Sequence, residues 1–242
     1  MSDADGDSSV SRSRRRFVQS FSLIPVAATL GSGDGLSSSG PSNVADAAEQ
    51  SYQPGFFTAD EWAFIVAICD RLIPADEIGP GAAELGVPEF LDRHMQTPYA
   101  NGAIWYMQGP FLEAAPEFGY QGRLPLREIL RVGIAEMNAH CSKAFAGKGF
   151  AQLTAADQER LLEAAQADSL RFEGISSQLF FAYLLGEVRN GYFADPVYGG
   201  NKGMGSWKMI GYPGARADYM DWVTVRDKPY PLPPVDLAGK RG

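Results

Sequence analysis

Residues 125–145 read P-L-R-E-I-L-R-V-G-I-A-E-M-N-A-H-C-S-K-A-F, the longest stretch of the sequence with a helical pattern. Its apolar residues recur at the i, i+3, i+4, i+7 spacing that places side chains on one face of an α-helix. These residues are Leu126, Ile129, Leu130, Gly133, Ile134, Met137 and Cys141. Gly147 then supplies a helix stop. The stretch predicts a long amphipathic helix that buries one face.

Five further stretches have helical features. The first follows a capping box, in which the side chains of Thr58 and Glu61 accept hydrogen bonds from each other's backbone amides, and it ends at Pro74. Another begins after Thr154, a favoured N-cap residue. The five expected helices span residues 59–73, 89–95, 103–112 (broken by Pro110), 155–165 and 177–190. Because no stretch alternates between β-branched and polar residues, the predicted fold class is all-α.

The last expected helix is followed by residues 191–213, G-Y-F-A-D-P-V-Y-G-G-N-K-G-M-G-S-W-K-M-I-G-Y-P, which we call the glycine-rich block. Its glycines and prolines disfavour a helix or a central strand, so the sequence predicts a long loop. Its aromatic residues need cover, either from their own domain or from a partner protein. The candidate partner contacts are Tyr192, Phe193, Asp195, Tyr198, Trp207 and Tyr212.

A second interpretation makes the same block the small-molecule pocket of a self-contained periplasmic oxidoreductase or binding protein. Its lining would be Asp195, Tyr198, Asn201, Lys202 and Tyr212, with Asp195 as the general base. The simpler alternative gives two of these residues structural roles. Asp195 before Pro196 starts a turn, and Asn201 holds a left-handed turn.

A proline-rich sequence closes the chain. Residues 227–234 read D-K-P-Y-P-L-P-P, with four prolines in six positions, which predicts an extended polyproline II segment suited to lie along another surface. The expected organisation is a leader and linker in residues 1–50, a helical domain in residues 51–226 and a tail in residues 227–242.

The N-terminus carries an export pattern. Residues 13–19 read S-R-R-R-F-V-Q, which resembles the twin-arginine motif in Arg14, Arg15 and Phe17. Residues 17–30 are too short and too weakly apolar to span a bilayer permanently, and they fit the h-region of a cleaved signal peptide. The twin-arginine route carries folded proteins, typically with a cofactor inserted, yet the chain has no dinucleotide-binding, Walker or haem motif. The sequence therefore predicts a periplasmic protein that escorts a cofactor-bearing partner.

The net charge and the small number of histidines and cysteines argue against several classes of function. The net charge of -8 disfavours binding to nucleic acid or to an anionic membrane surface. The chain has two histidines, His94 and His140, and its two cysteines lie outside any C-x-x-C pattern, so no metal centre is expected. In an oxidising compartment Cys69 and Cys141 could pair, closing a loop of about 70 residues and stabilising the fold by roughly 4 kcal/mol. One of them could instead bond a partner chain, or both could stay free.

Three features together resemble the small (gamma) subunit of gluconate 2-dehydrogenase, subunit 3. They are the leader, the T-A-D-E-W start and D-R-L-I-P end of the first helix, and the run Asp195-Pro196…Tyr198-Gly199-Gly200-Asn201. The resemblance covers most of residues 55–224. It implies a non-catalytic helical subunit with no catalytic, cofactor-binding or metal-binding residues of its own. FAD would belong to a large dehydrogenase subunit of the glucose–methanol–choline type and haem c to a cytochrome c subunit, and any membrane contact would be made through these partners.

Overall fold

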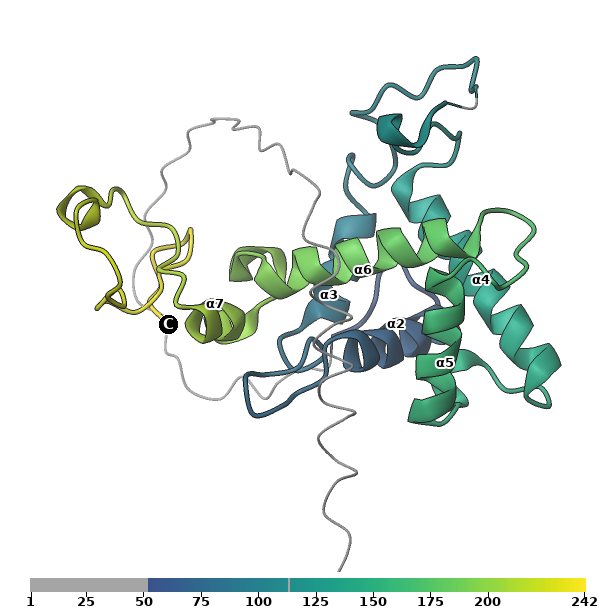
Figure 1. Cartoon of the computed structure of the whole chain (residues 1–242), viewed down its shortest axis with the longest axis horizontal. Coiled ribbons are helices and arrows are strands. Elements are labelled where there is room, and N and C mark those ends of the chain that lie inside the picture. Colours follow the sequence, from purple (N-terminus) through teal and green to yellow (C-terminus); the bar gives the residue numbers. More distant parts are fainter. Residues whose placement is uncertain (1–51, 113) are drawn as a thin grey trace, which may run out of the picture. The chain divides into compact units, whose positions relative to one another are not determined.

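Six α-helices and no β-strand lie in residues 52–112 and 114–242, the part of the chain that the structure, a computed structural model, describes. The helices are α2 (Ala59–Leu72), α3 (Val87–Met95), α4 (Leu126–Ala144), α5 (Ala155–Gln166), α6 (Ser177–Phe193) and α7 (Gly205–Ile210) (Figure 1). The all-α prediction is confirmed. None of these helices has the length and apolar character needed to cross a bilayer. The export residues Arg14, Arg15 and Phe17 lie outside the described residues.

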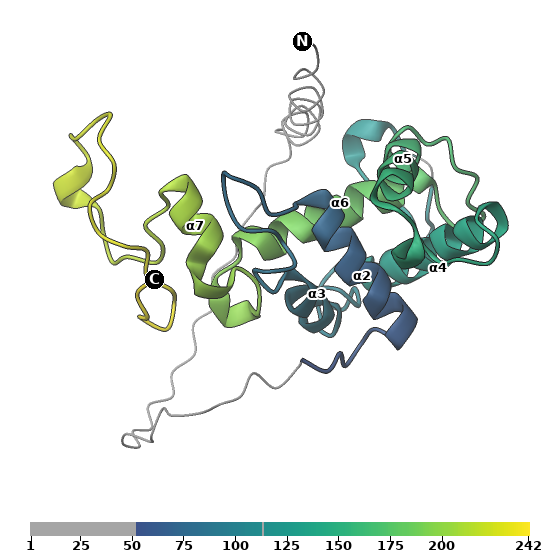
Figure 2. The same ribbon diagram turned by 90° about the horizontal axis from the view of Figure 1, so that it is seen from below.

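Helix α6 is the element on which the other helices pack. It contacts α2, α3, α4 and α5, and Figure 2 shows it running past all four. The buried ring of Phe180 on α6 lies 6.2 Å from that of Phe64 on α2, and Phe64 lies 5.0 Å from Phe150. Gly133 of α4 leaves room for Phe180, because a Cβ there would fall 1.9 Å from Cδ2 of the ring. Aromatic rings held between α2, α4 and α6 thus form one part of the core, beside buried aliphatic side chains such as Ile65, Leu130 and Leu184.

Side-chain caps fix the starts of α2 and α5. The predicted capping box is present: Thr58 Oγ1 accepts from the Glu61 amide at 3.3 Å, and Glu61 Oε2 accepts from the Thr58 amide at 2.9 Å. Thr154 caps α5 by accepting a hydrogen bond from the Asp157 amide at 3.2 Å. Both contacts satisfy amides that a helix start leaves without partners. The helices expected at residues 59–73, 89–95, 125–145, 155–165 and 177–190 are confirmed, with ends shifted by three residues or fewer.

A buried carboxylate ties the segment before α2 to α3. Asp92 accepts hydrogen bonds of 2.8 to 2.9 Å from the Tyr52 hydroxyl and from the backbone amides of Gly55, Phe56 and Phe57. Burial alone would raise the pKa of Asp92, but the donated hydrogen bonds outweigh burial and lower that pKa. Asp92 therefore stays ionised and fixes the chain as it enters the helical domain.

Two local predictions are wrong. Residues 103–112 form turns and irregular loop rather than a helix. The glycine-rich block is not one long loop, since α6 continues to Phe193 and α7 forms within the block. At Gly191 a Cβ would lie 2.6 Å from the ring of Phe90, so the glycine serves close packing of α6 on α3 instead of ending the helix.

The two thiols are both buried and free in the structure. Burial raises the pKa of Cys141 to about 11 and raises the pKa of Cys69 further. Both side chains are thus unpaired in the structure, and a bond of either thiol to a partner chain stays a prediction.

Candidate partner-binding site

The glycine-rich block folds back against the C-terminal end of α6. Gly200 approaches the helix so closely that a Cβ would lie 2.2 Å from the carbonyl oxygen of Gly191. Asn201 follows in the left-handed region, with φ 45°. Its Nδ2 donates to the Ala194 carbonyl at 3.0 Å, while its Oδ1 accepts from the amide and hydroxyl of Ser206 at 3.0 and 2.8 Å. These bonds fasten α7 to the end of α6.

Asp195 joins the block to the end of the chain. Its Oδ1 accepts from the Val197 amide at 3.0 Å and caps the short turn that follows. Its Oδ2 accepts from the Leu237 amide at 2.8 Å. Beside it, the Ala215 amide donates to the Val235 carbonyl at 2.7 Å. The tail, predicted to lie along another surface, thus packs its last residues on the block of its own chain.

Three of the six predicted partner contacts point into the domain. Tyr192 is buried, and its hydroxyl donates to the Pro80 carbonyl at 2.8 Å. Trp207 is also buried, and its Nε1 donates to the Phe193 carbonyl at 2.9 Å. Asp195 is buried in the contacts described above. These three residues shape the surface from behind and do not form it.

The other three predicted contacts face outward. Phe193, Tyr198 and Tyr212 are exposed, and so are Val197 and Ile210. We call these five residues the block surface. The ring of Tyr212 meets the buried Trp207 edge to face, with centroids 5.0 Å apart, so that ring is held in place. Exposed aromatic and aliphatic side chains on a rigid support are typical of protein-binding sites.

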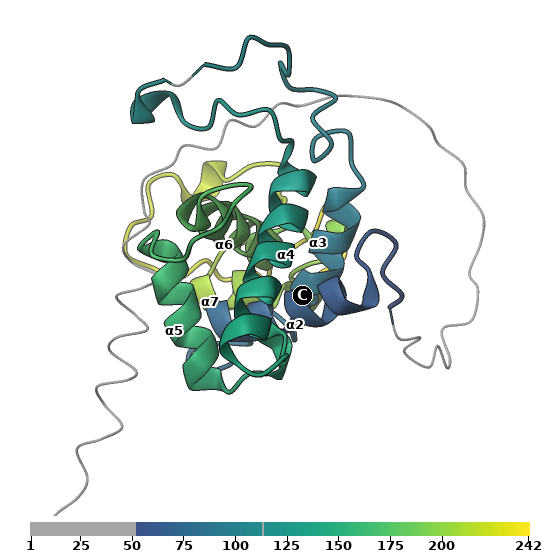
Figure 3. The same ribbon diagram turned by 90° about the vertical axis from the view of Figure 1, so that its right-hand side faces the viewer.

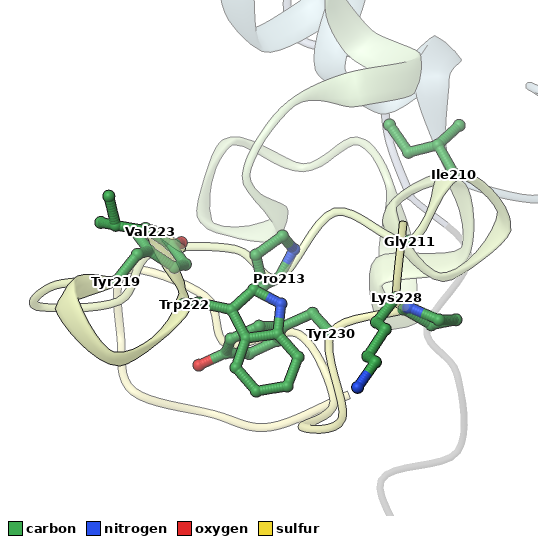
Figure 4. Close-up of a pocket in the computed structure, with 9 residues that line it drawn as sticks. Ile210, Gly211, Pro213, Tyr219, Trp222, Val223, Lys228 and Tyr230 are labelled. Carbon is green, nitrogen blue, oxygen red and sulfur yellow. The ribbon is translucent and has the colours of Figure 1, made fainter. Parts of the chain in front are cut away.

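A cavity of about 540 Å³ adjoins the block surface through Ile210 (Figure 4). The rings of Trp222 and Tyr230 meet edge to face at 5.4 Å, and Tyr219 lies 5.9 Å from Tyr230. The lining comprises Ile210, Gly211, Pro213, Tyr219, Trp222, Val223, Lys228, Pro229 and Tyr230. Its aromatic walls extend the apolar surface of the block toward the tail.

Three of the five residues of the alternative small-molecule site, Asp195, Asn201 and Lys202, have polar partners within the chain. Both carboxylate oxygens of Asp195 accept backbone amides, and the amide of Asn201 bonds at both ends. The Lys202 Nζ lies 2.6 Å from Glu89 Oε2. A general base needs a free lone pair aimed at a substrate. The contacts therefore favour the structural roles, in which Asp195 caps a turn and Asn201 holds a left-handed one.

A buried carboxyl group on α6 faces a histidine on α3. Glu187 is 6% exposed, and its Oε2 lies 3.4 Å from His94 Nε2, while its Oε1 accepts from Asn190 at 3.2 Å. Burial raises the pKa of Glu187 to about 7 and lowers the pKa of His94. Because both shifts favour uncharged forms, the contact is weaker as an ion pair than its distance suggests. Within the described residues, no three His, Cys, Asp or Glu side chains are grouped to hold a metal.

Sequence reasoning missed a second exposed surface, residues 99–122, which we call the arm. It leaves the end of α3 and returns at the start of α4, and Figure 3 shows it beyond the ends of both helices. Several of its large apolar side chains face solvent: Tyr106 is 84% exposed and Phe118 is 73% exposed. The signal was present as a run of large apolar residues interrupted by Gly102, Gly109 and Gly119.

A family model supplies the class of the protein. The model described as gluconate 2-dehydrogenase subunit 3 matches residues 59–214, from the first residue of α2 to the residue after the block. The chain belongs to the gluconate 2-dehydrogenase subunit 3 family. This family takes its name from one subunit of a dehydrogenase, and the chain is a subunit of that class. No curated protein and no solved structure gives a significant match.

The residues that the family model matches include both exposed surfaces. The arm and the block surface both lie within the matched residues, whereas Tyr219, Trp222 and Tyr230 of the cavity lie beyond them. The cavity is thus formed in part by sequence that the family model does not include.

Proposed function

We propose that this chain is the non-catalytic small subunit of a periplasmic FAD-dependent dehydrogenase complex that oxidises a sugar or a sugar acid. Membership in the gluconate 2-dehydrogenase subunit 3 family is the observation that carries the proposal. The chain escorts the flavin-bearing large subunit through twin-arginine export and then stabilises it. A cytochrome c subunit receives the electrons, and the complex meets the inner membrane through these partners.

The block surface supports the proposal from the structure. Phe193, Tyr198 and Tyr212 present aromatic area to solvent on a support that Asn201 and Asp195 hold rigid. Aromatic side chains lose little conformational entropy on binding, so fixed ones make effective anchors at an interface. The large subunit covers this surface in the assembled complex.

The leader supplies the export half of the proposal. The large subunit needs its flavin inserted before translocation, and the signal at Arg14 and Arg15 directs the folded pair to the twin-arginine route. The chain thus provides the export signal for the large subunit that it binds.

Subcellular fractionation tests the escort role. In the native host, Arg14→Lys with Arg15→Lys removes the arginine pair but keeps its charge. Arg12→Lys with Arg16→Lys makes the same chemical change outside the pair and serves as the control. The paired variant should reduce periplasmic flavin-dependent dehydrogenase activity to the level of cells without the chain, and the control should not. Normal periplasmic activity in the paired variant would refute the escort role.

A further inference from the structure

The arm, residues 99–122, is fixed at its first end by aromatic contacts and a backbone bond. The ring of Tyr99 lies 5.4 Å from His94 of α3 and meets Trp105 edge to face at 5.0 Å. The Arg127 amide, in the first turn of α4, donates to the Ala100 carbonyl at 3.0 Å. The arm therefore starts from a held position against two helices.

The second end of the arm is fixed against α6. The ring of Tyr120 meets Tyr183 of α6 edge to face, with centroids 6.0 Å apart. The Tyr120 hydroxyl also accepts a hydrogen bond from the Leu124 amide at 3.0 Å, just before α4 begins. Because both ends are held, the middle of the arm is presented away from the helices (Figures 1 and 3).

The exposed side chains of the arm are large and apolar. Ile104, Tyr106, Leu112 and Phe118 are all more than two-thirds exposed. Exposing this apolar area to water is unfavourable, and groups of such side chains on one segment mark binding surfaces. Tyrosine and phenylalanine of this kind act as anchors when a partner offers an apolar pocket. A leucine beside them adds apolar area that binding would remove from water.

The charge of the arm limits which kind of partner it can bind. Residues 99–122 contain no lysine or arginine, but they contain Glu113 and Glu117, and the whole chain has a net charge of -8. An anionic lipid surface would repel the arm, and a second copy would bring the same negative charges together. The complementary surface is an apolar protein groove with basic side chains at its rim.

We propose that the arm is a docking element that inserts Tyr106, Leu112 and Phe118 into an apolar, basic-rimmed groove on the flavin-bearing subunit of the complex. This inference rests on the proposed function. It adds a second partner contact beside the one at the block surface. It also gives a role to a segment whose large apolar side chains are exposed instead of packed in the core.

Site-specific cross-linking identifies what the arm touches. The full chain carrying Tyr106→p-benzoylphenylalanine is purified from the native host through a C-terminal tag and irradiated within the complex. Lys143→p-benzoylphenylalanine, at the exposed far end of α4, is the matched control. The arm variant should give a cross-linked product that contains the flavin-bearing subunit, at higher yield than the control. A product joining two copies of this chain, a lipid adduct, or no product in an intact complex overturns the inference.

Recovery of the flavin-bearing subunit measures what the arm contributes. The arm variant Tyr106→Ser/Leu112→Ser should weaken the complex roughly 30-fold or more, as the loss of interface anchors does. The control Val66→Ser/Ile78→Ser removes two exposed apolar side chains outside the arm and should leave recovery unchanged. Equal recovery from both variants refutes the arm inference alone. If the wild-type chain itself brings down no flavin-bearing subunit, the proposed function fails as well.

Discussion

The helical core and the arm use large apolar side chains in opposite ways. Phe64 and Phe180 are 1% exposed and pack against other rings between the helices. Tyr106 and Phe118 are exposed, although the arm is held at both ends. Because both of its ends are held, the arm is not a poorly packed part of the core. The core accounts for the stability of the chain, whereas the arm and the block surface are the two surfaces that we propose bind a partner.

The largest expected effect is in the core. Phe180→Ala removes a ring that α2, α4 and α6 enclose, and it should lower the free energy of unfolding by about 3–5 kcal/mol. Urea-induced unfolding followed by circular dichroism measures the change. A loss below about 1 kcal/mol would mean that this ring does not hold the helices together, and the contrast with the arm would disappear.

The next effect concerns the segment that leads into the core. Asp92→Ala removes the acceptor for five side-chain hydrogen bonds and should cost about 3 kcal/mol, because partly buried donors lose their partner. Limited proteolysis should then cut residues 52–57 faster than in the wild type. Asp70→Ala removes an exposed carboxylate of α2 and serves as the control, with little expected change. Equal proteolysis of both variants would contradict the role of Asp92.

The buried pair of Glu187 and His94 should make the free energy of unfolding depend on pH. Folded Glu187 has a pKa of about 7, above that of the unfolded chain, so the proton it holds stabilises the fold at low pH. This contribution is lost as the pH rises through the folded pKa. Relative to Glu187→Gln, the wild type should lose about 2–3 kcal/mol between about pH 5 and pH 8.

The other titratable groups near Glu187 must be accounted for in that measurement. His94 has a lowered pKa and loses stability in the opposite direction, as the pH falls, but it does so in both proteins. Tyr99 and Tyr183 face Glu187 and have raised pKa values, so they stay neutral throughout the range. Parallel pH profiles of wild type and Glu187→Gln would show that the carboxyl group titrates normally.

The smallest expected effect is in the arm. Tyr106→Ser should change the free energy of unfolding by less than about 0.5 kcal/mol, since the side chain is exposed. Urea-induced unfolding of the isolated chain is the measurement, with Phe180→Ala as the contrasting variant. Destabilisation of the order seen in the core would mean that the arm packs on its own chain, and would remove the reason to assign it a partner.

Helix positions could be predicted from local signals, and long-range placement could not. Thr58, Glu61 and Thr154 predicted the starts of α2 and α5, because caps act within one turn. The end of α6 was missed, since the packing of Gly191 on Phe90 joins segments about a hundred residues apart. A glycine that serves close packing looks in sequence like one that ends a helix.

The candidate site was located in sequence, but its inward and outward residues were not separated. Tyr192 and Tyr198 look equivalent in the glycine-rich block, yet Tyr192 finds the Pro80 carbonyl and is buried while Tyr198 is exposed. That partner lies 112 residues away along the chain. The arm was missed because an expected helix at residues 103–112 gave its apolar residues a face to bury.

Native mass spectrometry of the complex, purified through a tag on this chain, tests the central claim most directly. We expect an assembly of this chain with a larger subunit. After gentle dissociation the flavin mass should stay with the larger subunit, and this chain should carry no prosthetic group. A flavin, haem or metal that stays with this chain, or a chain that enters the instrument with no larger partner, would contradict the account.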